Sequence, residues 1–124
     1  MTVSLRELTT MRLGGPTRDF AQAADTDELL DLVRRADQRG TPVLLVGGGS
    51  NLVVADAGWD GLTIKIASND YRIDGTSVQA DAGVDWDDLV RATLAAGLAG
   101  FEPLSGIPGT VGATRCRTSA RSAP

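Results

Sequence analysis

Apolar residues recur at helical spacing in two stretches of the chain. In the first stretch Thr26 stands at an N-cap position, Asp27 and Glu28 follow in the first turn, and Gly40 supplies a stop. The apolar positions between them are Leu29, Leu30, Val33 and Ala36. This pattern predicts a helix that starts at Thr26 and ends before Gly40.

The second stretch begins after Asp85, another residue type favoured at N-caps, and stops at Gly97. Its apolar face is formed by Leu89, Val90 and Leu94. We therefore expect a second helix over residues 86–96.

Short apolar runs bounded by turn residues predict strands. Val43–Val46 is continuously apolar and is followed by three glycines, which predicts a central strand buried on both faces. Tyr71–Asp74 and residues 77–82 flank Gly75 and predict a hairpin. Further strands are expected at residues 19–24, 52–55 and 62–66. Together these strands predict a small mixed sheet.

Composition excludes several classes of function. The 124 residues are 42% hydrophobic and 23% charged, which indicates one globular domain, and the net charge of −4 offers no basic stripe for nucleic acid. Histidine is absent and Cys116 is the single cysteine, which removes disulfides, Cys/His zinc sites and Ser-His-Asp triads. No stretch approaches the roughly 18 apolar residues of a spanning helix. We expect a cytoplasmic protein that binds neither nucleic acid nor membrane, and no metal site.

The strongest chemical signal follows the run Val43–Val46. Backbone without side chains lets several N–H groups converge on an anion, while a hydroxyl and an amide add polar contacts. The candidate residues are Val46, Gly47, Gly48, Gly49, Ser50, Asn51 and Leu52. The segment lacks the lysine of a Walker A loop and the third glycine of the dinucleotide fingerprint, so a structural turn without a ligand stays open as an alternative.

A second glycine-rich segment follows the second predicted helix, over residues 97–112. Pro103 and Pro108 stiffen it, so it can shape a pocket. Glu102 could act as a general base, but a lone loop carboxylate is more often solvated or a cap. Trp59 and Trp86 adjoin apolar segments, which favours packing over ligand stacking.

In order and spacing, three segments resemble the UDP-N-acetylenolpyruvoylglucosamine reductase family, flavoenzymes of peptidoglycan precursor synthesis. T-T-M-R-L-G-G-P at residues 9–16 is similar to the family's N-T-F-R-I-G-G-P. V-G-G-G-S-N-L at 46–52 matches G-G-G-S-N-L, and G-W-D-G at 58–61 resembles G-F-D-G. G-L-A-G-F-E-P-L-S-G-I-P-G-T-V-G at 97–112 looks like G-L-A-G-L-E-x-L-x-G-I-P-G-x-V-G.

The resemblance implies an α+β, FAD-binding domain of the vanillyl-alcohol-oxidase (PCMH) type over residues 6–114, with the first subdomain and part of the second. It also implies that FAD is bound noncovalently, because the chain has no histidine and its one cysteine lies in the tail. NADPH would be the hydride donor, UDP-N-acetylenolpyruvoylglucosamine the substrate, and the protein a monomer. Beside residues 46–52, the flavin contacts it implies are Gly106, Ile107, Pro108, Gly109, Val111 and Gly112.

The sequence departs from the family after residue 114. The family continues with a segment like P-V-Q-N-V-G-A-F-G-A, where this chain has R-C-R-T-S-A-R-S-A-P. Loss of one nucleotide from suitable codons converts the first segment into the second. We therefore expect residues 115–124 to be an out-of-frame tail. The family's catalytic serine, its carboxylate partner and its substrate-binding residues lie beyond this point, so no catalytic residue is assigned and the chain alone is expected to be inactive.

A different class of function stays open. A free-standing module could use the loop from Gly47 to Asn51 to bind a nucleotide or another anion without redox chemistry. The two hypotheses differ in whether FAD is bound.

Overall fold

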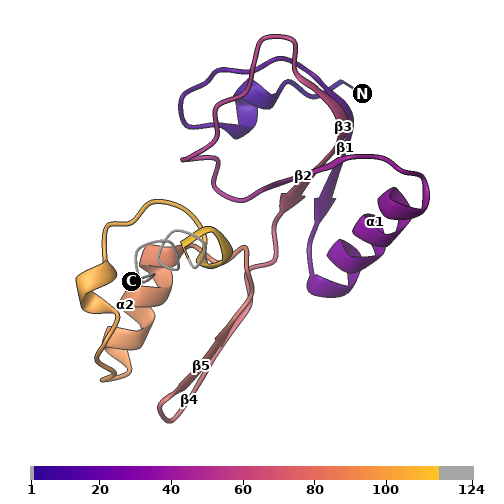
Figure 1. Cartoon of the computed structure of the whole chain (residues 1–124). Helices are drawn as coiled ribbons and strands as arrows, with labels where there is room; N and C mark the ends of the chain where they lie inside the picture. The colour runs from indigo at the N-terminus through magenta and orange to yellow at the C-terminus, as the bar shows by residue number, and fades with distance from the viewer. Residues whose placement is uncertain (1, 115–124) are drawn as a thin grey trace, which may run out of the picture.

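The computed structural model describes residues 2–114 in two groups of elements (Figure 1). The first group contains a 3-10 turn η1 (Leu5–Leu8), strands β1 (Thr17–Ala23), β2 (Val43–Val46) and β3 (Trp59–Ile66), and helix α1 (Thr26–Gln38). The second contains the hairpin β4 (Tyr71–Asp74) and β5 (Ser77–Ala80), helix α2 (Trp86–Ala95) and a 3-10 turn η2 (Glu102–Leu104). Residues 111–114 are again helical. The predicted tail, 115–124, lies outside the described residues.

The three strands of the first group form a parallel sheet in the order β1-β3-β2. The prediction that Val43–Val46 is central and buried on both faces is wrong, because this strand lies at an edge and Leu45 is 49% exposed. The central strand is β3, where Thr63 and Ile64 are fully buried. Asp60 and Lys65 interrupt its apolar pattern, which hides its central position in the sequence.

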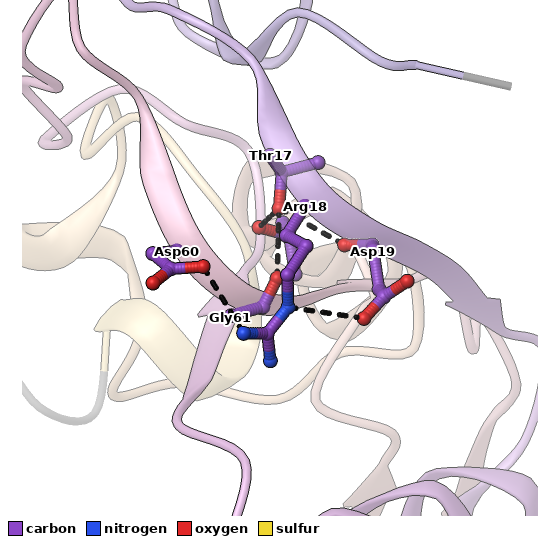
Figure 2. Close-up of polar contacts among 6 residues, drawn as sticks. Thr17, Arg18, Asp19, Asp60 and Gly61 are labelled. Atoms are coloured by element: carbon purple, nitrogen blue, oxygen red, sulfur yellow. Dashed lines mark hydrogen bonds and ion pairs between the residues drawn. The ribbon is translucent and has the colours of Figure 1, made fainter.

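Strands β1 and β3 are joined by a buried hydroxyl pair as well as by backbone pairing. Thr17 Oγ1 and Thr63 Oγ1 lie 2.7 Å apart, and Thr17 Oγ1 also lies 2.9 Å from the carbonyl oxygen of Asp19 and 3.3 Å from that of Gly61. Figure 2 shows this cluster, with Arg18 reaching outward from the same strand to Asp60 at 3.0 Å. The buried hydroxyls therefore fix the strand pair, whereas the exposed ion pair contributes little.

Helix α1 begins at Thr26, but its N-cap lies one residue earlier than the sequence predicts. The N-cap is Asp25, whose carboxylate accepts a hydrogen bond from Glu28 N at 2.8 Å, and Thr26 is the first helical residue. The Glu28 carboxylate accepts in return from Ala24 N at 2.8 Å. This reciprocal pairing resembles a capping box. Asp25 is the N-cap because its side chain reaches the N–H of the third helical residue. Gly40 follows the helix with a φ of 66°, as the stop signal predicts.

The second group has its own apolar core on α2. Val84, Trp86, Leu89 and Val90 are buried together, and partly buried side chains from β5 and the following loops pack on them. The predicted helix is confirmed, with Asp85 as N-cap accepting from Asp88 N at 3.0 Å. The predicted hairpin is also confirmed, although β5 ends at Ala80.

Two expectations about the sheet are wrong. The strands form no single mixed sheet, because β4 and β5 pair only with each other among the described strands. Residues 52–55 form no strand: Ala55 uses its carbonyl to accept from Gly15 N and Gly58 N, both at 2.9 Å, and so serves a loop junction. Within residues 2–114, no helix has the length and apolar character needed to cross a membrane.

Candidate functional site

The glycine-rich loop leaves the carboxyl end of β2 and forms most of one wall of a cleft of about 230 Å³. Pro108 and Ala113, from the second glycine-rich segment and the helical turn after it, line it as well. The full lining is Leu45, Val46, Gly47, Gly48, Gly49, Ser50, Asn51, Leu52, Pro108 and Ala113. All seven loop residues predicted from the sequence therefore lie at one cleft.

The loop presents backbone N–H groups that the described chain does not use. Within residues 2–114, the N–H groups of Gly48, Gly49, Ser50 and Asn51 donate to no carbonyl or side chain. Unpaired amides at a cleft wall need water or a ligand acceptor, and consecutive amides suit an anion such as a diphosphate. The residues present therefore fit the phosphate portion of a dinucleotide.

Close contact between the two glycine-rich segments depends on missing side chains. A Cβ on Gly47 would come within 2.6 Å of Thr110 Oγ1, and one on Gly48 within 3.2 Å of Gly109 Cα. Ser50 Oγ donates across the same junction to the Pro108 carbonyl at 3.5 Å. The structure therefore brings together two segments that lie about half the chain apart.

The segment at residues 9–16 supports the loop from behind. Gly49 has a φ of 71°, and a Cβ there would collide with the carbonyl oxygen of Leu8. Thr10 N donates to the Gly49 carbonyl at 3.1 Å. Thr9 is buried and its hydroxyl donates to the Leu13 carbonyl at 3.1 Å. The first and second segments of the family pattern thus form one packed unit.

The remaining predicted flavin contacts are held mainly by the scaffold. Val111 N donates to the Val84 carbonyl at 2.8 Å, and Gly112 N donates to the Ala82 carbonyl at 3.0 Å. Gly106 N donates to the Asp87 carboxylate at 2.8 Å. Ile107 packs against the α2 core, and Gly109 meets the glycine loop. Of this second set, Pro108 is the residue that lines the cleft.

The Glu102 carboxylate accepts hydrogen bonds from backbone N–H groups at the start of η2. Its carboxylate accepts from Gly100 N at 2.6 Å. Hydrogen bonds from its own backbone N–H and from Gly100 lower the pKa of Glu102 below its ordinary value. It is absent from the cleft lining, so the geometry matches the cap interpretation.

Packing is also the role of Trp86. Its Nε1 donates to the Leu104 carbonyl at 2.8 Å, and its ring lies 5.4 Å from that of Phe101. Trp59 is half-buried at the start of β3, and its indole N–H has no acceptor among residues 2–114. No group of three or more potential metal-ligating side chains occurs in this part of the chain either.

One residue at the loop was not singled out in the sequence. Lys65, on the central strand β3, donates through Nζ to the carbonyl oxygen of Gly47. The register explains the contact, because Lys65 pairs with Val46, the residue before Gly47. A lone lysine in a strand carries no local signal of this role, since the pairing of parallel strands is not readable from either strand alone.

Comparison with known proteins bears on the two classes of function. A family model described as an FAD binding domain matches residues 18–118. The chain belongs to the FAD binding domain family. This membership favours the flavin hypothesis over a non-redox anion-binding module, and the α+β FAD-binding fold predicted from the sequence is confirmed.

The relatives described here share the name UDP-N-acetylenolpyruvoylglucosamine reductase. The chain is 52% identical over 110 residues to the UDP-N-acetylenolpyruvoylglucosamine reductase of Streptomyces coelicolor, covering 89% of this chain and 29% of the relative. It is 51% identical over 112 residues to the protein of that name in Nocardia farcinica, covering 90% and 29%. The crystal structure of UDP-N-acetylenolpyruvylglucosamine reductase (MurB) from Thermus caldophilus superposes with a TM-score of 0.71 at 34% identity, covering 90% of this chain and 39% of that one.

These comparisons confirm the family resemblance seen in the sequence motifs. The chain spans less than a third of the length of the curated relatives above. The activity of the whole reductase therefore does not pass to this chain without further argument.

Proposed function

We propose that this chain supplies the diphosphate-binding wall of the FAD site in a UDP-N-acetylenolpyruvoylglucosamine reductase. The observation that carries the proposal is the run of unused N–H groups from Gly48 to Asn51 along the cleft. Gly47 and Gly48 keep that wall free of side chains, and Ser50 adds a hydroxyl. These residues bind and orient the cofactor without touching the reacting atoms.

When bound, FAD would supply hydride-transfer chemistry, for which the family resemblance implies NADPH as the donor and the enolpyruvyl double bond of the UDP-sugar as the acceptor. The chain's own part is to hold the diphosphate noncovalently, since no described side chain offers a histidine or cysteine for attachment. Such a protein would work in the cytoplasm as a monomer, in cell-wall synthesis that supports cell shape and division.

We further propose that this chain alone does not catalyse the reaction. No residue here is assigned as proton donor or as substrate ligand, and the family's segments for both lie beyond residue 114. Sequencing across the codons for Thr114 and Arg115 tests the frameshift, which predicts that the family's segment returns in the next frame.

Equilibrium dialysis of the 124-residue chain against FAD, with ATP as competitor, tests the cofactor. We expect saturable FAD binding that equimolar ATP does not displace. Equal displacement by ATP would favour the non-redox module, and no binding at saturating FAD would contradict the proposal. NADPH consumption that depends on the enolpyruvyl substrate would contradict the proposed inactivity while supporting the family activity.

A further inference from the structure

Lys65 is the single lysine of the chain, and it lies directly behind the glycine loop. Its ammonium group donates to the Gly47 carbonyl from the neighbouring strand. Among residues 2–114, no carboxylate pairs with it: the ion pairs of this part of the chain all involve arginine. In the described part of the chain, its ammonium group therefore has no carboxylate within ion-pair distance at the point where β2 enters the cleft wall.

The geometry of one peptide group links Lys65 to the cleft. The Gly47–Gly48 peptide is trans, so the Gly47 carbonyl and the Gly48 N–H point in opposite directions. Because the carbonyl turns toward Lys65, the Gly48 N–H turns away from it. That N–H has no acceptor in the described chain, and both glycines line the cleft.

Electrostatics also favour this orientation of the Gly47–Gly48 peptide. A carbonyl oxygen beside an anion site is unfavourable unless its negative end is turned away or neutralised. The Lys65 contact does both, and it adds a full positive charge within reach of the diphosphate field. Glycine has unusual backbone freedom, so the loop itself does not fix this peptide orientation.

We propose that Lys65 is a positioning residue for FAD: it orients the Gly47–Gly48 peptide so that the Gly48 N–H faces the diphosphate, and it supplies the charge behind that amide. The role rests on the proposed FAD binding. Neither the family motifs nor the predicted flavin contacts include Lys65.

The test compares Lys65→Met and Lys65→Arg in the 124-residue chain, with Arg72→Met as a control for loss of one positive charge outside the cleft. Arg72 is exposed on β4, where its guanidinium donates to Gln79 Oε1 at 3.2 Å. FAD titrations are followed by NMR through the Gly48 amide signal. We expect Lys65→Met to raise the Kd for FAD by roughly 10-fold or more, while Lys65→Arg and Arg72→Met change it by less than about 3-fold.

Two further readouts separate positioning from general stability. The difference between wild type and Lys65→Met should shrink as salt is raised from about 0.05 M toward 1 M, because screening weakens the charge contribution. The Gly47 carbonyl carbon and Gly48 amide nitrogen shifts should move in Lys65→Met before any FAD is added. Urea unfolding checks that each variant stays folded at the titration temperature.

The outcomes distinguish this inference from the function on which it rests. If wild type binds FAD and Lys65→Met binds it equally well, the role of Lys65 is overturned and the proposed function stands. If Lys65→Met leaves the apo shifts of Gly47 and Gly48 unchanged, the positioning role is overturned. If wild type binds no FAD at saturation, the proposed function fails and the diphosphate role of Lys65 fails with it.

Discussion

Gly49 sits against the main chain of Leu8: its φ is 71°, and a methyl group on its Cα would run into the Leu8 carbonyl oxygen. The obstruction is backbone, so it has no rotamer by which to move aside. This relationship ties the amino-terminal segment of the chain to the loop that lines the cleft, so the identity of residue 49 matters for folding.

Gly49→Ala should therefore destabilise the fold much more than Gly40→Ala. Both glycines have left-handed φ, which costs alanine about 1–2 kcal/mol, but the space around Gly40 is open. Gly49→Ala also overpacks the contact with the Leu8 carbonyl, which should cost about 1–3 kcal/mol more. Urea denaturation of both variants measures the difference, and equal midpoints would show that the loop relaxes around the methyl group.

Removal of the α1 cap provides a second test. Asp25→Ala should cost about 1 kcal/mol of unfolding free energy, because Glu28 N loses its side-chain acceptor. Thr26→Ala should change stability by less than about 0.5 kcal/mol. The pair of variants, compared by thermal unfolding, distinguishes the cap seen in the structure from the one that the sequence suggests; the reverse order would restore Thr26 as the cap.

The buried hydroxyls of Thr17 and Thr63 should be energetically coupled. Thr17→Val removes the hydroxyl that contacts both Thr63 and the Asp19 carbonyl, and it should cost about 1–3 kcal/mol. Because Thr63→Val breaks the same pair, the double variant should be less destabilised than the sum of the single variants by about 1 kcal/mol. Strict additivity in the double-mutant cycle would mean that the two hydroxyls act independently.

The lowered pKa of Glu102 predicts that the free energy of unfolding decreases at acid pH. Its folded-state pKa is lowered by N–H donors, so the stability it contributes is present above its ordinary pKa and is lost as pH falls through the folded value. Glu102→Gln should therefore flatten the stability–pH profile on the acid side. NMR titration of the Glu102 carboxyl carbon measures the pKa directly, and an ordinary value would remove the basis for this prediction.

Local signals made the helices and the hairpin predictable. Asp85 and Gly97 mark the ends of α2 to within a residue or two, because caps act on the nearest few amide and carbonyl groups. Likewise Gly75, with a φ of 59°, sits in the hairpin turn between β4 and β5. Each of these features is decided by residues close in sequence.

Strand order was not predictable in the same way. Val43–Val46 is more apolar than β3, yet β3 is central, because parallel pairing is decided by long-range contacts that leave no mark on either strand. Residues 52–55 are continuously apolar, which suggests a strand, but the Ala55 carbonyl accepts from Gly15 N and Gly58 N at a loop junction.

The candidate site was predictable only in part, because some of its features are local in sequence and others depend on long-range contacts. Glycines mark a close approach of backbone, so the loop at 47–49 was visible in the sequence. Its partners were not: Thr110 and Gly109 meet the loop from the second group of elements, and Lys65 reaches it from another strand. The flavin roles of all the predicted residues stay predictions, and the observed contacts of Gly106, Ile107, Val111 and Gly112 are with the scaffold.

The close contact between Gly48 and Gly109 also has a consequence for the order in which the cleft forms during synthesis. Synthesis proceeds from the amino terminus, so the amide-lined loop leaves the ribosome well before the segment that closes on it. In a nascent chain this contact cannot form until residue 109 has been made, so this part of the cleft is completed only after the loop itself has been synthesised.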